Sequence, residues 1–187
     1  CDLTCQIHSG LTLDTHLNDV DNDGIPDDID TDVDGEPLAD ADGDGLIEIH
    51  TLDQLFAIRH NLAGTYFKSS PYATANATGC PYRTILGRLT RECHGYELAS
   101  SLNVDSNGNG VIDELDWHQG YWEPIGDREN PFTAIFEGNG FEIRNMKVGV
   151  WDYAGLFGVT QGATLSNLGI TGRWMSVEGY QGDAGGL

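Results

Sequence analysis

The chain of 187 residues is 39% hydrophobic and has a formal net charge of −21, with 30 acidic residues against nine Lys and Arg. This length and apolar content suffice for one hydrophobic core, or for a small domain with an appended module. Because phosphate binding requires clustered basic residues, the charge argues against nucleic acid and anionic membranes as partners. No apolar run approaches the ~18–20 residues of a membrane span.

Residues 1–18 carry little hydrophobic pattern, but they include two cysteines. Processed bacterial lipoproteins begin with an acylated cysteine, so an N-terminal lipid anchor at Cys1 is one interpretation. A trimmed sequence or an ordinary disulfide cysteine would look the same. Cys1 and Cys5 can pair with each other or with cysteines elsewhere in the chain.

Acidic residues are concentrated at the N-terminal end, with sixteen of the 30 in residues 1–53 and none of the basic residues before Arg59. Without cations this segment is expected to repel itself and stay expanded. Its acids recur at positions 1, 3, 5, 9 and 12 around a glycine at position 6, which is the spacing of a calcium loop. The ligands of the first predicted loop are Asp19, Asp21, Asp23, the carbonyl of Ile25, Asp27 and Asp30.

Two further acidic runs follow the first loop. The nearer run continues from Asp30, which two neighbouring ions can then share, through Asp32 and Asp34. The next predicted loop has Thr51 at position 12, so Asp53, a carbonyl or water must supply that ligand; its other ligands are Asp40, Asp42, Asp44 and Glu48. A solvated linker is the alternative, because Asp, Asn and Gly favour turns. The fixed spacing favours calcium, and metal binding is then expected to be coupled to folding.

A β-prone run at residues 46–49 precedes the clearest helix signal in the chain. Thr51 and Gln54 fit a capping box, and Gly64 is expected to stop the helix. The apolar residues at helical spacing are Leu52, Leu55, Ile58 and Leu62. We expect this apolar stripe to cover the open end of a sheet or solenoid rather than to bind a cofactor.

Residues 65–95 are polar and interrupted by proline and glycine, so they are expected to form an excursion loop. A disulfide between Cys80 and Cys93 is predicted within it, and it would stabilise the fold by about 3 kcal/mol in the chain-entropy model. A zinc site that uses His94 beside Cys93 is the competing interpretation, but the sequence has no CxxC pair.

The clearest calcium loop runs from Asp105 to Asp116, after an extended stretch that begins at Tyr96. Gly110 fills position 6, where the chain must turn sharply, and Ile112 at position 8 is expected to face a core. The predicted ligands are Asp105, Asn107, Asn109, the carbonyl of Val111, Asp113 and Asp116. Because Asp is shorter than the usual Glu at position 12, the predicted affinity is modest.

From residue 122 onward, short β-prone runs alternate with glycines. Residues 143–148 and 165–170 share the pattern apolar-x-Asn-apolar-x-apolar at an offset of 22 residues. Such repeats without intervening helices predict a parallel β-solenoid, with Asn145 and Asn167 stacked at equivalent corners in left-handed backbone conformations. An antiparallel sandwich is the alternative, because residues 137–140 could form a hairpin turn.

The predicted organisation has three parts. Residues 1–48 form an N-terminal segment with Asp-rich calcium loops, residues 49–121 contain the helix, the disulfide loop and a calcium loop, and residues 122–187 form the solenoid coils. The expected fold class is therefore mainly β: a parallel β-helix (solenoid) in the C-terminal part, one capping α-helix, and N-terminal calcium-binding acidic repeats.

The Gly-Leu-Phe-Gly sequence at residues 155–158 resembles the GLUG motif of bacterial surface proteins, and the similarity extends over roughly residues 40–187. Residues 19–34 resemble thrombospondin type 3 calcium repeats, which many surface proteins contain. These resemblances imply secretion, a β-helical fold and adhesive or surface-array roles. Some GLUG proteins also carry a protease domain, whose HExxH zinc motif is absent from this sequence.

The leading functional hypothesis is a non-enzymatic, calcium-stabilised extracellular module of a bacterial cell surface, in adhesion or in a filament. Partners would be further copies, through strand addition or coil stacking, or other surface proteins. The alternative is a carbohydrate-binding or polysaccharide-active β-helix protein, with stacking aromatics among Trp117, Tyr121, Trp122, Trp151, Tyr153 and Trp174. No catalytic residue is predicted, because neither GxSxG nor GxxxxGK[ST] occurs.

Overall fold

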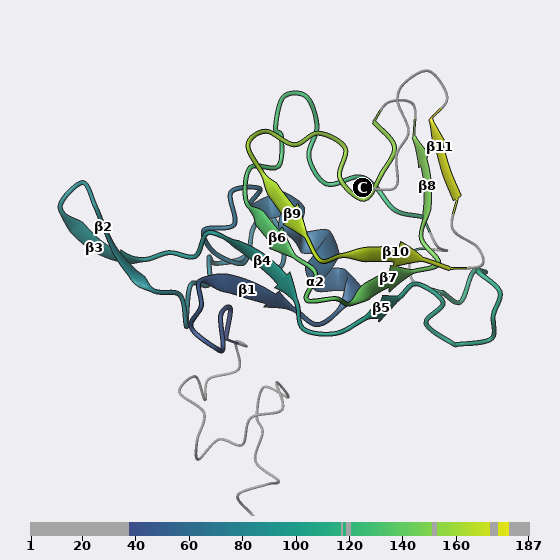
Figure 1. The fold of residues 1–187 in the computed structure, drawn as a ribbon, viewed down its shortest axis with the longest axis horizontal. Helices are drawn as coiled ribbons and strands as arrows, with labels where there is room; N and C mark the ends of the chain where they lie inside the picture. The colour runs from purple at the N-terminus through teal and green to yellow at the C-terminus, as the bar shows by residue number, and fades with distance from the viewer. Residues whose placement is uncertain (1–37, 117, 119–120, 151–152, 173–175, 180–187) are drawn as a thin grey trace, which may run out of the picture.

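The structure is a computed structural model, which describes residues 38–116, 118, 121–150, 153–172 and 176–179. Within these ranges the chain is mainly β, with one short α-helix, as predicted (Figure 1). None of the described helices has the length and apolar character needed to cross a membrane.

The largest sheet brings together segments from all three predicted parts of the chain. Its strands, in the spatial order β1-β4-β6-β9, are β1 (Leu46–Ile49), β4 (Gly95–Leu98), β6 (Ile135–Glu137) and β9 (Thr164–Ser166). All three pairings are parallel. The register aligns Ile47, Tyr96, Phe136 and Leu165. The first three are almost fully buried, so apolar side chains from distant parts of the sequence form one column in the core.

Each strand of the second sheet follows one strand of the first along the chain, and the two sheets are neighbours (Figure 1). Its parallel strands, in the order β10-β7-β5, are β5 (Leu102–Asn103), β7 (Glu142–Arg144) and β10 (Gly169–Thr171). A third parallel pair consists of β8 (Lys147–Val150) and β11 (Ser176–Gly179). Because β6 and β7 pair with other strands and not with each other, residues 137–140 do not form the hairpin of an antiparallel sandwich.

Left-handed asparagines occupy the turns between these sheets, as predicted, but they do not stack as predicted. Asn145 (φ 64°) lies between β7 and β8, whereas Asn167 (φ 49°) lies between β9 and β10. Asn167 lies beside the β6–β7 turn, where its carbonyl accepts from Gly140 N at 2.8 Å. Asn145 instead donates from Nδ2 to Asn103 Oδ1 at 2.9 Å. The 22-residue offset would align Ile143 with Leu165, but the backbone register aligns Ile143 with Ile170. The offset therefore reflects only that both turns use a left-handed asparagine.

The helix α2 (Leu52–Ala57) follows β1 and begins with the predicted capping box. Gln54 N donates to Thr51 Oγ1 at 3.1 Å, and Thr51 N donates to the Gln54 side chain at 3.1 Å. The helix ends earlier than predicted, because the chain tightens into a 3₁₀ turn, η1 (Ile58–His60), well before Gly64. Leu55 and Ile58 are fully buried, and the partly buried Leu52 and Leu62 pack against the same core.

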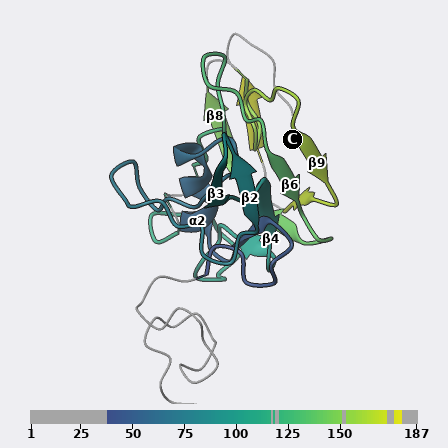
Figure 2. The same cartoon turned by 90° about the vertical axis from the view of Figure 1, so that its left-hand side faces the viewer.

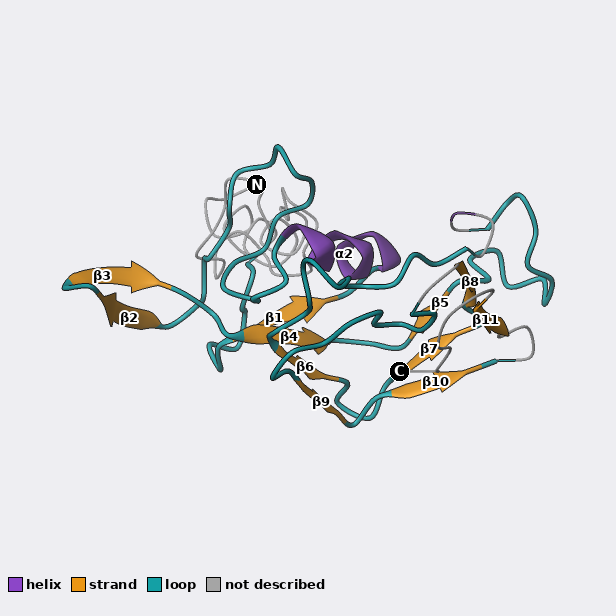
Figure 3. Ribbon diagram, turned by 90° about the horizontal axis from the view of Figure 1, so that it is seen from above, coloured by secondary structure: helices purple, strands orange, loops and turns teal. Residues whose placement is uncertain are grey.

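Residues 65–95 contain an element that the sequence does not predict, an antiparallel hairpin of β2 (Tyr82–Ile85) and β3 (Arg88–Arg91). The hairpin projects away from the sheets in two views (Figures 1 and 3) and faces the viewer in Figure 2. Every residue of both strands is exposed. The predicted Cys80–Cys93 disulfide is present at its base, with the two Cα atoms 5.0 Å apart.

The core is rich in aromatic residues around β6 of the main sheet. The Phe132 and Phe157 rings lie 4.8 Å apart, and the Phe136 ring meets Phe157 edge-on at 5.4 Å. Phe157 belongs to the Gly-Leu-Phe-Gly sequence of residues 155–158. A Cβ at Gly158 would come within 2.5 Å of the Gly126 carbonyl oxygen, so the close backbone approach at this position requires glycine.

Candidate metal centre

The loop from Asp105 to Asp116 follows β5, and its own side chains fix its shape. Asp105 Oδ2 accepts a hydrogen bond from Gly110 N at 2.9 Å. Asp116 lies at the other end of the loop, and its Oδ1 accepts from Ser106 N and its Oδ2 from Asp113 N, both at 2.9 Å. Both aspartates are 6% exposed, which is unusual for carboxylates. The loop therefore has two buried acids at its closure point.

Asp105 Oδ1 is the one buried side-chain oxygen or nitrogen among the described residues that has no hydrogen-bond partner. Burying an unsatisfied carboxylate oxygen is costly, so such an atom calls for a partner such as a cation or an ordered water. The other predicted ligands are also carboxylate, amide or carbonyl oxygens, the donors that calcium prefers. The donor set therefore fits calcium.

The loop that begins at Asp40 repeats this hydrogen-bond pattern at equivalent positions. Asp40 Oδ2 accepts from Gly45 N at 2.9 Å, as Asp105 Oδ2 does from Gly110 N. Asp44 Oδ1 accepts from Leu46 N at 2.7 Å, as Asn109 Oδ1 does from Val111 N. Two loops far apart in the sequence thus adopt one local geometry.

The two loops close with different residues. In the Asp40 loop, Glu48 accepts from Ala41 N at 2.8 Å and from Asp42 N at 3.2 Å, at loop positions 2 and 3. In the Asp105 loop, the N–H groups at these two positions, Ser106 and Asn107, donate instead to Asp116 Oδ1. Glu48 at position 9 therefore takes the place of a position-12 acid, and one of the three expected substitutes, Asp53, lies instead in the first turn of α2.

The acidic residues of the Asp40 loop lie close enough to share a cation. Oxygens of Asp40, Asp42 and Glu48 lie within 4.8 Å of one another, and Asp40 is fully buried. Among the described residues, the carboxylates of the Asp105 loop do not form a group this tight. Two of that loop's predicted ligands, Asn107 and Asn109, are amides.

Glu97 is a candidate ligand that the loop spacing does not predict. Its carboxylate lies within 4.8 Å of oxygens of Asp42 and Asp44, although it belongs to β4. It is 7% exposed, and its Oε2 accepts from Asn139 Nδ2 at 2.6 Å. The register places Glu97 beside Glu48, and an apolar residue precedes Glu in both strands and in β6. That recurring pair is the signal in the sequence that could have identified it.

Burial opposes ionisation in the Asp40 loop. It raises the pKa of Glu48 to about 7, against hydrogen bonds from backbone N–H groups that lower it. Burial also raises the pKa values of Asp40 and Glu97, with neighbouring aspartates adding to the effect. In the other loop, the Asp113 N–H hydrogen bond holds the pKa of Asp116 below its usual value. A divalent cation would relieve the repulsion in the Asp40 loop.

We expect the stability of the calcium-free protein to fall as pH rises from about 4.5 to about 7. The folded-state pKa of Glu48, about 7, lies above its ordinary value of 4.5, so the folded protein binds an extra proton in that window. Thermal melts in EDTA across this range measure the effect, and Glu48→Gln should flatten the slope. A Glu48→Gln protein with the wild-type slope would contradict the assignment.

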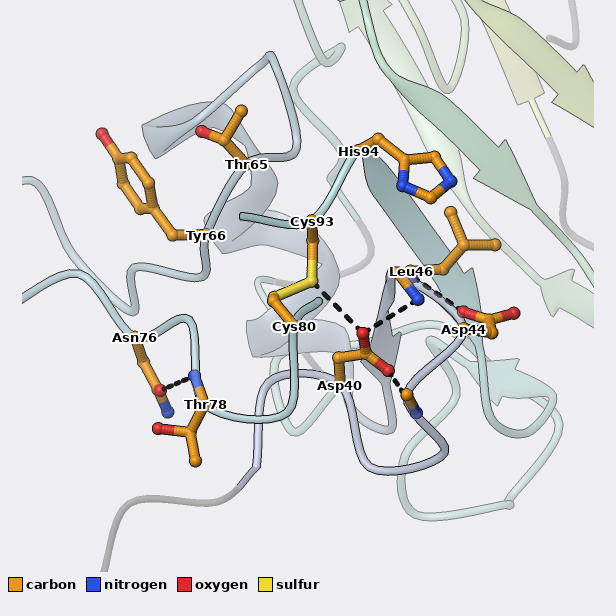
Figure 4. Close-up of a disulfide and its surroundings, with 12 residues drawn as sticks. Asp40, Asp44, Leu46, Thr65, Tyr66, Asn76, Thr78, Cys80, Cys93 and His94 are labelled. Carbon is orange, nitrogen blue, oxygen red and sulfur yellow. Dashed lines mark hydrogen bonds between the residues drawn. A yellow bond between two sulfur atoms is a disulfide. The ribbon is translucent and has the colours of Figure 1, made fainter. Parts of the chain in front are cut away.

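The disulfide beside Asp40 argues against the zinc interpretation. Cys93 Sγ lies 3.5 Å from Asp40 Oδ2, but it is bonded to Cys80 and is not a thiolate ligand (Figure 4). His94 Nδ1 lies 3.0 Å from Arg83 Nη2. The cysteine and histidine therefore have structural contacts of their own.

The remaining predicted site residues are only partly covered by the structure. The first two predicted calcium runs lie outside the described residues, namely Asp19, Asp21, Asp23, Ile25, Asp27, Asp30, Asp32 and Asp34. So do three of the aromatic candidates, Trp117, Trp151 and Trp174. Trp122 is buried and donates from Nε1 to the Leu156 carbonyl at 3.0 Å, so it packs in the core, whereas Tyr121 is 61% exposed.

No family model matches the chain, and no solved structure matches it either. A protein of Evansella cellulosilytica, which carries the provisional name Gly-rich membrane protein, is 41% identical over 69 residues. The match covers 35% of this chain and 8% of that protein. The chain therefore spans less than a tenth of the length of this relative, and the likeness is confined to one segment.

Proposed function

We propose that this chain is a non-enzymatic, calcium-stabilised structural module of a bacterial cell surface, in adhesion or in a surface assembly. The observation that carries the proposal is the buried Asp105 Oδ1, which has no hydrogen-bond partner and belongs to a loop of oxygen donors. Calcium would supply that partner and would fix the loop between β5 and the core residue Trp122.

The hydrogen-bond pattern shared by the two loops supports the same role for the Asp40 loop. There, an ion would lie beside the start of β1, one of the two edge strands of the main sheet. Its charge would offset the acids that burial and mutual repulsion destabilise, Asp40 and Glu48. Calcium would thus stabilise the sheet rather than take part in a reaction.

We further propose that the parallel strands are successive coils of a GLUG-type β-solenoid. The support is that the chain returns to the main sheet at β4, β6 and β9, always parallel and with apolar residues aligned. It returns to the second sheet at β7 and β10 in the same manner. Stacked coils make a stiff, elongated scaffold, which suits a mechanical role on a surface.

A location in the cell envelope is supported by the name of the Evansella cellulosilytica relative, which describes it as a membrane protein. The disulfide adds to this, because disulfides persist in oxidising compartments outside the cytoplasm. We propose that the module is extracellular.

Calcium titration by isothermal calorimetry tests the proposed function. The wild-type protein should bind calcium, and Asp105→Asn should lose one ion or bind it about tenfold or more weakly, because ligand charge sets affinity. Glu114→Gln is the matched control: it removes one charge from an exposed, non-ligand position of the same loop, and should bind as the wild type does. Equal ion counts and affinities in Asp105→Asn and the wild type would refute the assignment.

A further inference from the structure

The β2–β3 hairpin is the most basic part of a very acidic chain. It carries Arg83, Arg88 and Arg91, three of the nine basic residues, and no acid lies between Pro81 and Arg91. The ion pairs found among the described residues are those of Arg59 and Arg144, so the hairpin arginines have no carboxylate partner there. Their charge is available to an acidic partner.

The hairpin also exposes large apolar side chains on both faces. The register pairs Tyr82 with Arg91 and Ile85 with Arg88, so each face combines an apolar residue with an arginine. Tyr82 is 61% exposed, Leu89 67% and Ile85 42%. The Arg91 guanidinium lies 4.8 Å from the centroid of the Tyr82 ring. Such a mixture of aromatic, aliphatic and arginine side chains is typical of the centre of a protein interface.

The tip of the hairpin carries a residue that its turn does not favour. Leu86 has φ 50° and Gly87 has φ 77°, and both are central residues of the two-residue turn. Positive φ angles at both positions favour Asn or Gly, and a bulky residue is disfavoured there. Leu86 is also fully exposed. A partner that covers Leu86 would remove its apolar side chain from water, and this contact would offset the cost of the unfavourable backbone angle.

A complementary surface lies at the opposite end of the molecule. The loop that follows β5 lies at one end of the longest axis, and the hairpin lies at the other (Figure 1). This loop is acidic, and it exposes Leu115 (79%) and Val111 (52%) next to the exposed acid Glu114. One bound calcium would leave it negative, because it contains four acids. The two ends therefore carry opposite charges, and both expose apolar side chains.

We propose that the hairpin of one copy docks on the Asp105–Asp116 loop of a second copy. The contact is heterologous, because it joins two different surfaces, so repetition gives a ring or an open filament. The open backbone edges of the hairpin also allow strand addition in the contact. The proposal rests on the surface-assembly part of the proposed function, and the loop's own hydrogen bonds hold it in shape.

Sedimentation velocity of the purified protein in calcium, over a range of concentrations, tests the proposal. The wild type should form species larger than a monomer. Leu86→Asn should raise the dissociation constant about tenfold or more, while it supplies a residue that the turn favours, so the hairpin stays folded. Arg88→Glu and Glu114→Lys should each weaken association similarly. A wild type that stays monomeric, or a Leu86→Asn protein that assembles as the wild type does, overturns the proposal.

Mixing the two charge variants makes the test specific for a second copy. Arg88→Glu has an altered hairpin with an intact loop, and Glu114→Lys has the reverse, so their mixture restores complementary contacts. We expect the mixture to assemble where each variant alone does not. Failure of the mixture to assemble, with wild-type circular dichroism for both variants, would contradict the assigned pair of surfaces.

Two controls separate this proposal from the proposed function. Calcium titration of Leu86→Asn should give wild-type ion binding; a monomeric wild type that binds calcium refutes the docking and leaves the calcium sites intact. Wild-type association that persists when no calcium binds refutes the calcium sites alone. A monomer that binds an acidic polysaccharide such as polygalacturonate, and loses this on Arg88→Glu, would make a glycan the partner instead of a second copy.

Discussion

Removal of calcium by excess EDTA is expected to lower the melting temperature of the protein by about 5–10 °C for each ion lost. At a calcium concentration of about 100 times the dissociation constant, one ion contributes about 2.7 kcal/mol to the free energy of unfolding. The effect should be larger than for an ordinary ligand, because the acids of the Asp40 loop repel one another without a cation. Differential scanning calorimetry in calcium and in EDTA measures the shift.

EDTA that has been saturated with calcium beforehand is the control for this experiment, and it should leave the melting temperature unchanged. Re-addition of calcium after chelation should restore the original value. If the melting curves with and without calcium superimpose, metal binding is not coupled to folding, and calcium does not stabilise the scaffold.

Phe136→Ala is expected to destabilise the protein by about 3–5 kcal/mol, which corresponds to a fall in melting temperature of roughly 10 °C or more. Phe136 is fully buried, and β6 aligns it between Tyr96 and Leu165 of the neighbouring strands. Its loss would leave a cavity in the apolar column that joins consecutive passes of the chain. Thermal melts of the variant, with calcium present throughout, measure the effect.

The matched control is Tyr72→Ala, because Tyr72 is 97% exposed. This change also removes an aromatic ring, but it should alter stability by no more than about 0.5 kcal/mol. If Phe136→Ala were as stable as Tyr72→Ala, the alignment of β4, β6 and β9 would be wrong.

The features that the sequence predicted correctly are short-range. The capping box needs only Thr51 and Gln54, and a left-handed turn needs only an asparagine such as Asn145. The disulfide was also predicted correctly, since Cys80 and Cys93 are close in sequence and flank one polar excursion. These features depend on local backbone chemistry, which residue types and spacing reveal.

The features that the sequence did not predict depend on contacts between distant residues. The 22-residue offset matched two asparagine turns that do not stack, because register is set by how apolar residues such as Phe136 and Leu165 align across strands. Glu97 approaches Asp42 only because β4 pairs with β1. The hairpin was hidden by Leu86, which is an unusual residue in a tight turn.

A crystal structure of the protein grown in calcium would test the central claim most directly, since that claim assigns an ion to the Asp105–Asp116 loop. We predict anomalous scattering from calcium in this loop, with Asp105 Oδ1 about 2.3–2.6 Å from the ion. A well-ordered loop with only water beside Asp105 Oδ1, at saturating calcium, would contradict the account.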